Sequence, residues 1–296
     1  AGVQKILIVG SGDVARRMLS HLARRYRVHA VLRDAARAGE WRAAGAIPLI
    51  ADLDDRTSLA RLAGLADLVI HLAPPPGEGR DDPRTRNLLA ALGKAKSLPR
   101  HLVYISTTGV YGDCGGQVID ETRGLNPQSA RAARRVAAEQ RLRAWGARNG
   151  VVVSILRAPG IYAAERLPLA RLENGLPALV DRDDVHTNHI HADDLAAACV
   201  AALRHGRANR TYNVVDDSSL KMSDYFDRVA DAFGLPRPPR LTRDAAAAVL
   251  SPVQMSFMRE SRRIGNRRLR TELRVRLAFP TVDDGIADAL QRRASC

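Results

Sequence analysis

Three small residues near the start of the chain have the spacing of a phosphate-binding turn. Gly10, Gly12 and Ala15 form the pattern G-x-G-x-x-A directly after the apolar run at residues 6–9. In a dinucleotide site the first glycine allows the tight turn, the second lets the backbone approach a pyrophosphate, and the third small residue lets the next helix pack closely. That helix directs free N–H groups and its positive dipole end at the phosphates. The pattern predicts a dinucleotide site, the alternative being a turn with only a structural role.

A cation at the next strand end bears on which dinucleotide binds. The strand expected at residues 28–32 ends at Arg33, with Asp34 one position later. A carboxylate at this strand end hydrogen-bonds the ribose 2′-OH of NAD, whereas an arginine can pair with the 2′-phosphate of NADP. We therefore expect NADP rather than NAD. The alternative is that Arg33 is only a solvated loop residue.

Two further strand ends complete the expected cofactor site. Asp52 and Leu53 follow a strand at residues 46–50, and the strand at residues 67–73 ends in three prolines. A strand that ends in small residues and prolines suits a surface beneath a cofactor. The predicted cofactor-binding residues are Gly10, Ser11, Gly12, Asp13, Val14, Ala15, Arg33, Asp52, Leu53, Leu72, Ala73 and Pro74.

The elements that position these residues alternate along the chain. Apolar strand patterns and amphipathic helix patterns follow one another with short links as far as the buried strand at residues 101–106. Such alternation is typical of right-handed βαβ units in a parallel sheet. The predicted fold class is α/β, with a Rossmann-type, doubly wound parallel sheet.

The composition of the chain limits which partners and which cellular compartment are expected. The net charge of the 296 residues is +14, but most of the cations are arginines spread along the whole chain, so nucleic acid is not expected as a partner. No apolar stretch has the length of a membrane span, and no secretory signal is visible. Because Cys114, Cys199 and Cys296 are scattered, neither a disulfide framework nor a zinc site is indicated. The cytoplasm is the expected compartment.

Short motifs across nearly the whole chain, taken together, carry a family resemblance. They include GSGDVA at the glycine turn, STTGVYG, ILRAPGIY, NHIHADDLA and TYNVVDD. In this order they resemble the NAD-dependent epimerase/dehydratase group of extended, atypical short-chain dehydrogenases/reductases. The resemblance implies an NAD(P)-binding Rossmann domain at residues 1–160, to which residues 186–215 return. It also implies a smaller C-terminal substrate lobe from residues 161–185 and 216–296.

The catalytic positions implied by the resemblance are only partly filled. In this family a Ser or Thr polarises the substrate, and a Tyr-x-x-x-Lys pair does acid–base work. Thr107 stands at the Ser/Thr position, but Arg131 and Arg135 stand where Tyr and Lys belong. A guanidinium stays protonated and cannot be a general base. Arg135 can still hold a ribose hydroxyl or a phosphate, and Arg131 can clamp an anionic substrate or be a solvated cation.

Two other residues are candidate acid–base groups. Tyr111 follows the fifth strand, near the expected nicotinamide position, where it can donate a proton or serve packing. Asp81 replaces the family's usual Asn and can act as a base if it is desolvated. With Thr107, Arg131 and Arg135 these two residues complete the candidate catalytic set.

The histidines at positions 186, 189 and 191 invite a metal-site hypothesis. On a strand His189 and His191 point the same way. The resemblance instead implies a structural return to the sheet, with Asp193 or Asp194 capping the next helix. No metal site is predicted.

These residues and the family resemblance lead to two hypotheses for the function. The first is an NADP-dependent oxidoreductase or epimerase/dehydratase-like enzyme, acting on a nucleotide-sugar-like or other small polar substrate. The second is a non-catalytic, NADP-binding sensor or interaction protein on the same fold. The missing Tyr–Lys pair favours the second, whereas the glycine turn, Thr107 and Tyr111 favour the first. Since family members often pair through the helix that carries Y-x-x-x-K, which is arginine-rich here, we expect a monomer or a homodimer.

Overall fold

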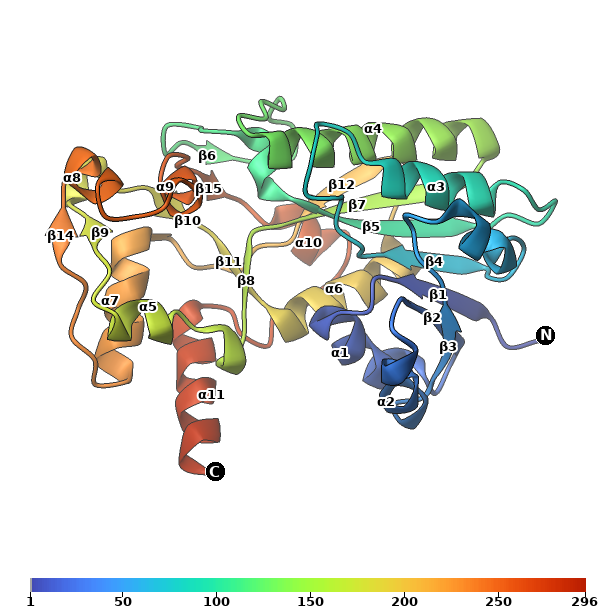
Figure 1. Cartoon of the computed structure of the whole chain (residues 1–296), viewed down its shortest axis with the longest axis horizontal. Helices are drawn as coiled ribbons and strands as arrows, with labels where there is room; N and C mark the ends of the chain where they lie inside the picture. The colour runs from blue at the N-terminus through green and yellow to red at the C-terminus, as the bar shows by residue number, and fades with distance from the viewer. Residues whose placement is uncertain (1) are drawn as a thin grey trace.

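The computed structural model describes residues 2–296 and contains a seven-stranded parallel sheet (Figure 1). The strand order is β12-β7-β5-β4-β1-β2-β3, so the order reverses where β1 lies between β4 and β2. Ligands of such sheets bind at the carboxyl ends of the strands, at this switch point. The expected α/β, Rossmann-type sheet is confirmed. Its strands are β1 (Lys5–Val9), β2 (Arg27–Leu32), β3 (Ala46–Ile50), β4 (Leu68–His71), β5 (His101–Thr107), β7 (Val152–Ala158) and β12 (Arg210–Asn213).

Both faces of the sheet are covered because the central strands are apolar on both sides. In β1, Ile6 and Ile8 pack into one hydrophobic core, whereas Leu7 and Val9 pack into the other. The helices α3 and α4 lie above the sheet in Figure 1, and α1, α2 and α6 lie below it. The bounds of these helices are α1 (Asp13–Leu22), α2 (Ala38–Ala43), α3 (Pro83–Leu92), α4 (Ala130–Asn149) and α6 (Ala192–His205).

Two connections between strands contain 3₁₀ turns. The segments are η1 (Ala35–Arg37), which precedes α2, and η2 (Arg56–Leu62). Each begins at an aspartate whose carboxylate accepts the N–H two residues later, Asp34 for η1 and Asp55 for η2. Such local bonds favour tight turns over continued α-helix.

The lobe, on the left in Figure 1, has a hydrophobic core of its own. Tyr225, Phe226 and Val229 of α7 pack there with Ile286 of α11. The lobe helices are α5 (Leu169–Glu173), α7 (Met222–Ala232), α8 (Arg243–Ala247), α9 (Pro252–Phe257) and α11 (Val282–Ala294). The shorter strands are β6 (Val118–Ile119), β8 (Gly160–Tyr162), β9 (Ala178–Leu179), β10 (His186–Thr187), β11 (His189–His191), β13 (Leu220–Lys221), β14 (Arg240–Leu241) and β15 (Arg263–Ile264).

One late segment packs with the sheet domain although it was expected in the lobe. Leu269 of α10 (Arg267–Thr271) and Leu273 are fully buried in the core beneath the sheet. These two side chains stand four residues apart and so present one apolar face to that core. The last third of the chain therefore crosses from lobe to sheet domain and back.

A buried polar network joins α4 to β5, β7 and β12. Arg157 donates two hydrogen bonds to the carboxylate of Glu139, the shorter at 2.7 Å, and both side chains are almost fully buried. Ser106 donates to the same carboxylate at 2.6 Å, and Arg157 also donates to the Tyr111 hydroxyl at 3.0 Å. Every strong charge in the network thus has a partner, as burial in a core requires.

Replacing the carboxylate of this network should unfold the protein more easily. Glu139→Gln leaves the Arg157 guanidinium buried without a counter-ion, and we expect a loss of about 3–5 kcal/mol in the free energy of unfolding. Urea titration followed by circular dichroism measures it. The control Glu173→Gln alters an exposed carboxylate and should stay within about 0.5 kcal/mol of the wild type. Equal stability of the two variants would contradict the assignment.

Candidate cofactor and substrate site

The glycine turn that follows β1 lies close against the backbone that follows β4. Gly10 has φ +103°, and a Cβ added there would lie 2.6 Å from the backbone nitrogen of Ala73, so only glycine fits. Gly12 precedes α1 with an ordinary φ of −93°, and no side chain caps the helix. A Cβ added at Gly12 would meet nothing within 4 Å. The turn therefore presents free helix N–H groups to open space, as an anion site requires.

A cavity of about 230 Å³ lies beside the turn, at the switch point of the sheet. It brings together residues from four strand ends that the sequence singled out separately. The predicted residues that line it are Gly10, Ser11, Gly12, Arg33, Asp52, Leu53, Ala73 and Pro74, with Val9, Val31, Ala51 and Arg84 as further lining residues. The fit to a dinucleotide rests on this cavity and on the uncapped helix beside it.

The other predicted cofactor residues do not line the cavity. Ala15 is buried and packs α1 against the sheet, which is the role expected of the third small residue. Asp13 pairs with Arg17 at 2.9 Å and with Arg166 of the lobe at 3.2 Å. Val14 packs against the same core as Ala15, and so does Leu72. These side chains support the turn and do not face its cavity.

Cations surround the cavity, and the carboxylate beside Arg33 is already engaged. Asp34 accepts the N–H of Ala36 at 2.9 Å as the N-cap of η1. Arg33 is exposed and makes no ion pair with any of the residues described. Arg37 reaches the Ser11 hydroxyl at 3.5 Å.

Arg84 is a cavity residue that the sequence analysis missed. It pairs with Asp54 at 2.9 Å and donates to the carbonyl of Pro74 at 3.2 Å. Its position in the first turn of α3 carries no motif of its own. Only the tertiary path of the preceding proline loop brings it to the cavity.

Two of the candidate acid–base residues prove to be structural. Tyr111 is 1% exposed, donates its hydroxyl hydrogen to Asn213 at 2.6 Å, and has its pKa raised by burial. Asp81 pairs with Arg141 at 2.7 Å, and this hydrogen bond lowers the pKa of the Asp81 carboxyl. Of the two roles open to Tyr111, the structure favours packing over proton donation, and Asp81 does not meet the condition of desolvation. The buried carboxylate of that loop is Asp82, which caps α3.

Thr107, Arg131 and Arg135 remain candidate site residues; Thr107 lies at the carboxyl end of β5, and the two arginines lie on α4. The Thr107 hydroxyl is half-buried at the end of β5 and accepts the N–H of Gly109 at 3.1 Å. Arg135 donates to the Tyr104 hydroxyl at 3.0 Å and to a β5 carbonyl, which fixes it against the strand. The Arg131 guanidinium lies 4.5 Å over the ring of Phe257 in lobe helix α9, a cation–π contact across the two parts.

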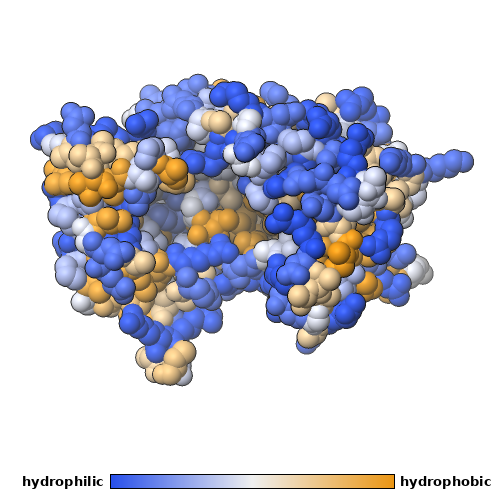
Figure 2. Space-filling view, in the orientation of Figure 1, coloured by the Kyte–Doolittle hydropathy of each residue, from blue (hydrophilic) through white to orange (hydrophobic). Residues whose placement is uncertain are grey.

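A second cavity of about 230 Å³ lies between the sheet domain and the lobe. Figure 2 shows a hollow between the two parts of the molecule, with hydrophobic atoms at its base. Distant segments supply the cavity walls, which is why the sequence did not reveal it. Its lining combines aromatic, polar and charged side chains: Thr108, Pro159, Gly160, His186, Thr187, Asn188, His189, Met222, Tyr225, Phe226, Phe257, Glu260 and Arg262.

The histidines of the return segment serve structure. The His189 ring lies tilted against the ring of Tyr225 with centroids 4.3 Å apart, and burial lowers the pKa of His189 to about 4. The side chain that caps α6 is His191, not Asp193 or Asp194 as expected; it accepts the N–H of Asp193 at 3.0 Å. Across residues 2–296 no three histidine, cysteine or acidic side chains gather as metal ligands.

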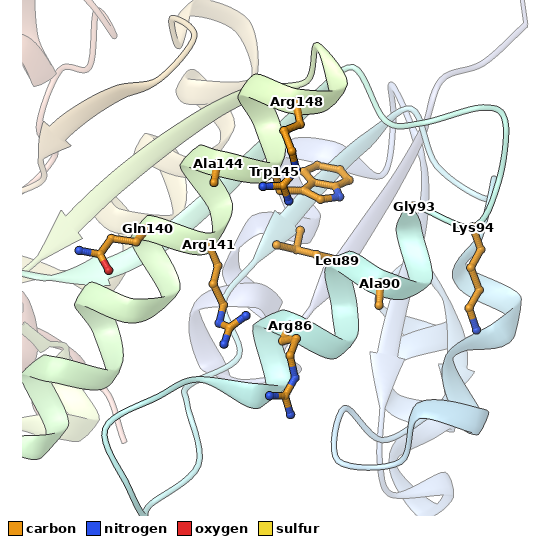
Figure 3. Close-up of a pocket in the computed structure, with 10 residues that line it drawn as sticks. All are labelled: Arg86, Leu89, Ala90, Gly93, Lys94, Gln140, Arg141, Ala144, Trp145 and Arg148. Carbon is orange, nitrogen blue, oxygen red and sulfur yellow. The ribbon is translucent and has the colours of Figure 1, made fainter.

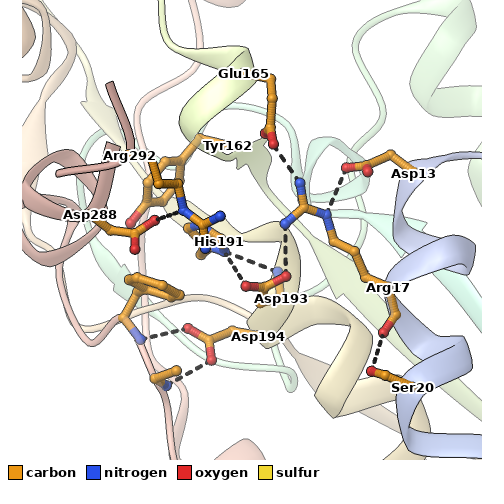
Figure 4. Close-up of polar contacts among 12 residues, drawn as sticks. Asp13, Arg17, Ser20, Tyr162, Glu165, His191, Asp193, Asp194, Asp288 and Arg292 are labelled. Atoms are coloured by element: carbon orange, nitrogen blue, oxygen red, sulfur yellow. Dashed lines mark hydrogen bonds and ion pairs between the residues drawn. The ribbon is translucent and has the colours of Figure 1, made fainter. Parts of the chain in front are cut away.

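The two expected capping aspartates make other contacts (Figure 4). Asp194 accepts the N–H groups of Ala278 and Phe279, and so holds the chain that enters α11. Asp193 pairs at 2.7 Å with Arg17, which also reaches Glu165 of the lobe at 3.2 Å. This ion-pair cluster joins the helix after the glycine turn to the lobe.

The switch point, the glycine turn and the adjoining lobe define a dinucleotide-binding α/β protein of the Rossmann type. The family model described as "NAD dependent epimerase/dehydratase family" matches residues 6–215. The chain belongs to this family, which binds NAD(P). No helix in residues 2–296 has both the length and the apolar character needed to cross a membrane.

Known proteins resemble the chain over most of its length. GDP-6-deoxy-D-mannose reductase from Pseudomonas aeruginosa is 29% identical over 77% of this chain and 80% of its own. A conserved protein of unknown function from Silicibacter pomeroyi DSS is 30% identical, with a TM-score of 0.81 over 99% of this chain and 100% of that one. dTDP-glucose 4,6-dehydratase from Bacillus anthracis, solved with NAD, shares the fold at 16% identity, with a TM-score of 0.78 over 99% and 97% of the two chains.

The two glycines of the turn should respond differently to the same substitution. Gly10→Ala forces a Cβ against Ala73 at positive φ and should cost at least about 2 kcal/mol of unfolding free energy. Gly12→Ala should stay within about 1 kcal/mol of the wild type but weaken NADPH binding about tenfold or more, because its Cβ fills the open space at the turn. Urea denaturation and fluorescence titration measure the two effects. Unchanged NADPH affinity in Gly12→Ala would contradict the assigned site.

Proposed function

We propose that the protein is an NADP-dependent oxidoreductase acting on a nucleotide-sugar-like or other small polar substrate. The observation that carries the proposal is the cavity at the glycine turn, where Arg33 is unpaired within residues 2–296 and Asp34 is occupied as a cap. The residue directly after β2 is thus Arg33 rather than a carboxylate, and Asp34, one position later, has one oxygen engaged as the cap of η1. The exposed guanidinium of Arg33 is suited to the 2′-phosphate of NADP.

The substrate is proposed to lie in the cavity between sheet domain and lobe. Thr108, in the wall of this cavity, directly follows Thr107. In this position the Thr107 hydroxyl can donate a hydrogen bond to a substrate oxygen, and NADP bound at the turn would supply hydride chemistry. Arg131 on Phe257 adds a cation at the lobe side. Similarity to a nucleotide-sugar reductase supports this substrate class.

The proton-exchanging group of such an enzyme differs from that of the family pattern. Arg131 and Arg135 stay protonated, so neither can accept a proton from a substrate hydroxyl. Among the histidines and carboxylates that line the cavity, His186 and Glu260 are only partly buried, whereas His189 is buried. Burial and the cations Arg263 and Lys221 lower the pKa of His186, which keeps its imidazole neutral and able to accept a proton.

A non-catalytic NADP-binding sensor or interaction protein is the second candidate function. It is favoured by the engagement of the residues that replace the family's acid–base pair: Arg135 is bound to β5, and Arg131 lies on Phe257. In this function Arg131 would couple the sheet domain to the lobe when the nucleotide binds. The two functions share the cofactor site and differ in turnover.

For the assembly we propose a monomer, whereas the expectation was a monomer or a homodimer. Outside the sheet, α3 and α4 frame a cavity of about 620 Å³ (Figure 3). Leu89 and Trp145 lie between three cations: Arg86 of α3, Lys94 just after α3, and Arg148 of α4. A second copy placed on this face would bring like charges together, which disfavours pairing. The cytoplasm stays the expected compartment.

The preference for NADP is tested at the end of β2. We expect Arg33→Ala to weaken NADPH binding about tenfold and to leave NADH binding within about twofold, because only NADPH carries the 2′-phosphate. Nicotinamide fluorescence measures both affinities. Arg42→Ala, an exposed arginine on α2, is the matched control and should change neither. Equal binding of NADPH and NADH by the wild type would refute the preference.

Turnover separates the two functions. With NADP⁺ and a panel of GDP-, UDP- and dTDP-linked sugars that includes GDP-6-deoxy-D-mannose, we expect NADPH to form with at least one sugar. Thr107→Ala should lower that rate about 100-fold without changing NADPH affinity, since its hydroxyl acts on the substrate. Thr271→Ala, on α10, is the control. NADPH binding without any turnover across the panel would favour the sensor.

A further inference from the structure

We propose that a pocket at the β12 edge of the sheet binds the phosphate group of a small molecule other than the cofactor. The pocket has a volume of about 390 Å³, which is within the range of small-ligand sites. Five guanidinium groups and a single carboxylate, Glu121, line it. The arginines are Arg123, Arg143, Arg157, Arg210 and Arg268.

Two of the five guanidinium groups are neutralised by carboxylates outside the pocket lining. Arg157 is held by Glu139, as described above. Arg210 forms a two-pronged ion pair with Glu272, with its shorter contact at 2.6 Å. Arg157 and Arg210 are therefore explained by ion pairs within the fold. Three guanidinium groups of the pocket remain to be explained.

Among the described residues, none of the remaining three guanidinium groups donates a hydrogen bond to a carboxylate. Arg123 donates to the neutral side chain of Gln117 at 2.8 Å, and Arg143 donates to Asn209 and to the Thr211 hydroxyl. Arg268 approaches Glu121 no closer than 3.9 Å, which is longer than a hydrogen bond. The pocket therefore carries an excess of positive charge that the described residues do not balance.

Glu121 is a weak counter-ion for these cations. Its carboxylate accepts the backbone N–H of Asn213 at 2.9 Å, and burial raises its pKa. For Arg143, burial lowers the pKa of the guanidinium, an effect that Glu139 partly offsets and Arg157 adds to. An anion in the pocket would favour the charged form of Arg143, since it supplies an opposite charge in a partly desolvated space.

The guanidinium groups are held in place before any ligand arrives. Arg268 donates to the carbonyl of Thr211 at 3.0 Å, and Arg143 donates to the carbonyl of Asn209 at 3.3 Å. These bonds cover the backbone of the edge strand, which needs such protection. Neutral donors would cover it equally well, so protection of the edge does not explain the charge. Fixed, planar guanidinium forks match the oxygens of a phosphate group.

The pocket is separate from the cofactor cavity. The strands β7, β5 and β4 lie between β12 and β1, so the two sites are four strand spacings apart, roughly 19 Å at about 4.8 Å each. A phosphate-bearing molecule can thus bind here while the glycine turn is occupied. The same phosphate chemistry is found in RNA, and the experiment therefore includes an RNA competitor.

Calorimetric titration with pyrophosphate, at fixed ionic strength and with and without saturating NADPH, tests the proposal. We expect one site to persist in NADPH, and the double variant Arg123→Gln/Arg143→Gln to weaken it about tenfold or more. Arg33→Ala alters only the cofactor cavity and should leave this site unchanged, so failure of the cofactor assignment is distinguishable. Arg123→Glu, at the less buried arginine, repeats the test if the double variant does not fold.

Each possible result of this titration either supports or overturns the proposed phosphate site. Loss of the NADPH-resistant site in the arginine variants, with Arg33→Ala unaffected, supports the pocket. Absence of any pyrophosphate site in the NADPH-saturated wild type, or equal affinity in wild type and variants, overturns it. A single-stranded RNA oligonucleotide that binds more tightly than pyrophosphate and displaces it would also overturn the small-molecule ligand and assign the pocket to RNA.

Discussion

The close approach of the first turn to the end of β4 is the constraint on which the site depends. Gly10 can contact the backbone of Ala73 only because it lacks a side chain and adopts a positive φ. This contact lets β1 lie directly beside β4 while α1 starts immediately after the turn. The order of the sheet reverses at the same point, so the free N–H groups of α1 open onto the crevice.

Helix α4 is anchored to the sheet by buried polar contacts and carries arginines on the side that faces the cleft. Its buried face is anchored by the Glu139–Arg157 pair, which fixes the helix against β7. Its cleft side carries guanidinium groups: Arg135 is bonded to β5, and Arg131 lies on Phe257 in the lobe. The family resemblance assigns proton exchange to the positions of Arg131 and Arg135, where a guanidinium stays protonated. If the protein is the enzyme proposed above, its acid–base group comes from elsewhere in the cleft.

The sequence predicted what local pattern determines and missed what tertiary contacts determine. The glycine spacing and the apolar strands indicated the sheet and most of the lining of the cofactor cavity. Arg84 escaped notice because only the path of the proline loop brings it there. Tyr111 seemed available because its bonds to Asn213 and Arg157 join residues far apart in sequence. The family resemblance implied a cap at Asp193 or Asp194, whereas His191, a residue type uncommon at this position, caps the helix.

Hydrogen–deuterium exchange with and without NADPH tests most directly whether the nucleotide lies across the glycine turn. The structure leaves the first N–H groups of α1 without a side-chain cap, so a bound phosphate should slow their exchange. We predict protection in peptides covering residues 10–16, together with those around Arg33 and Asp52. NADPH binding that leaves the exchange of residues 10–16 unchanged, with protection elsewhere, would contradict the central claim.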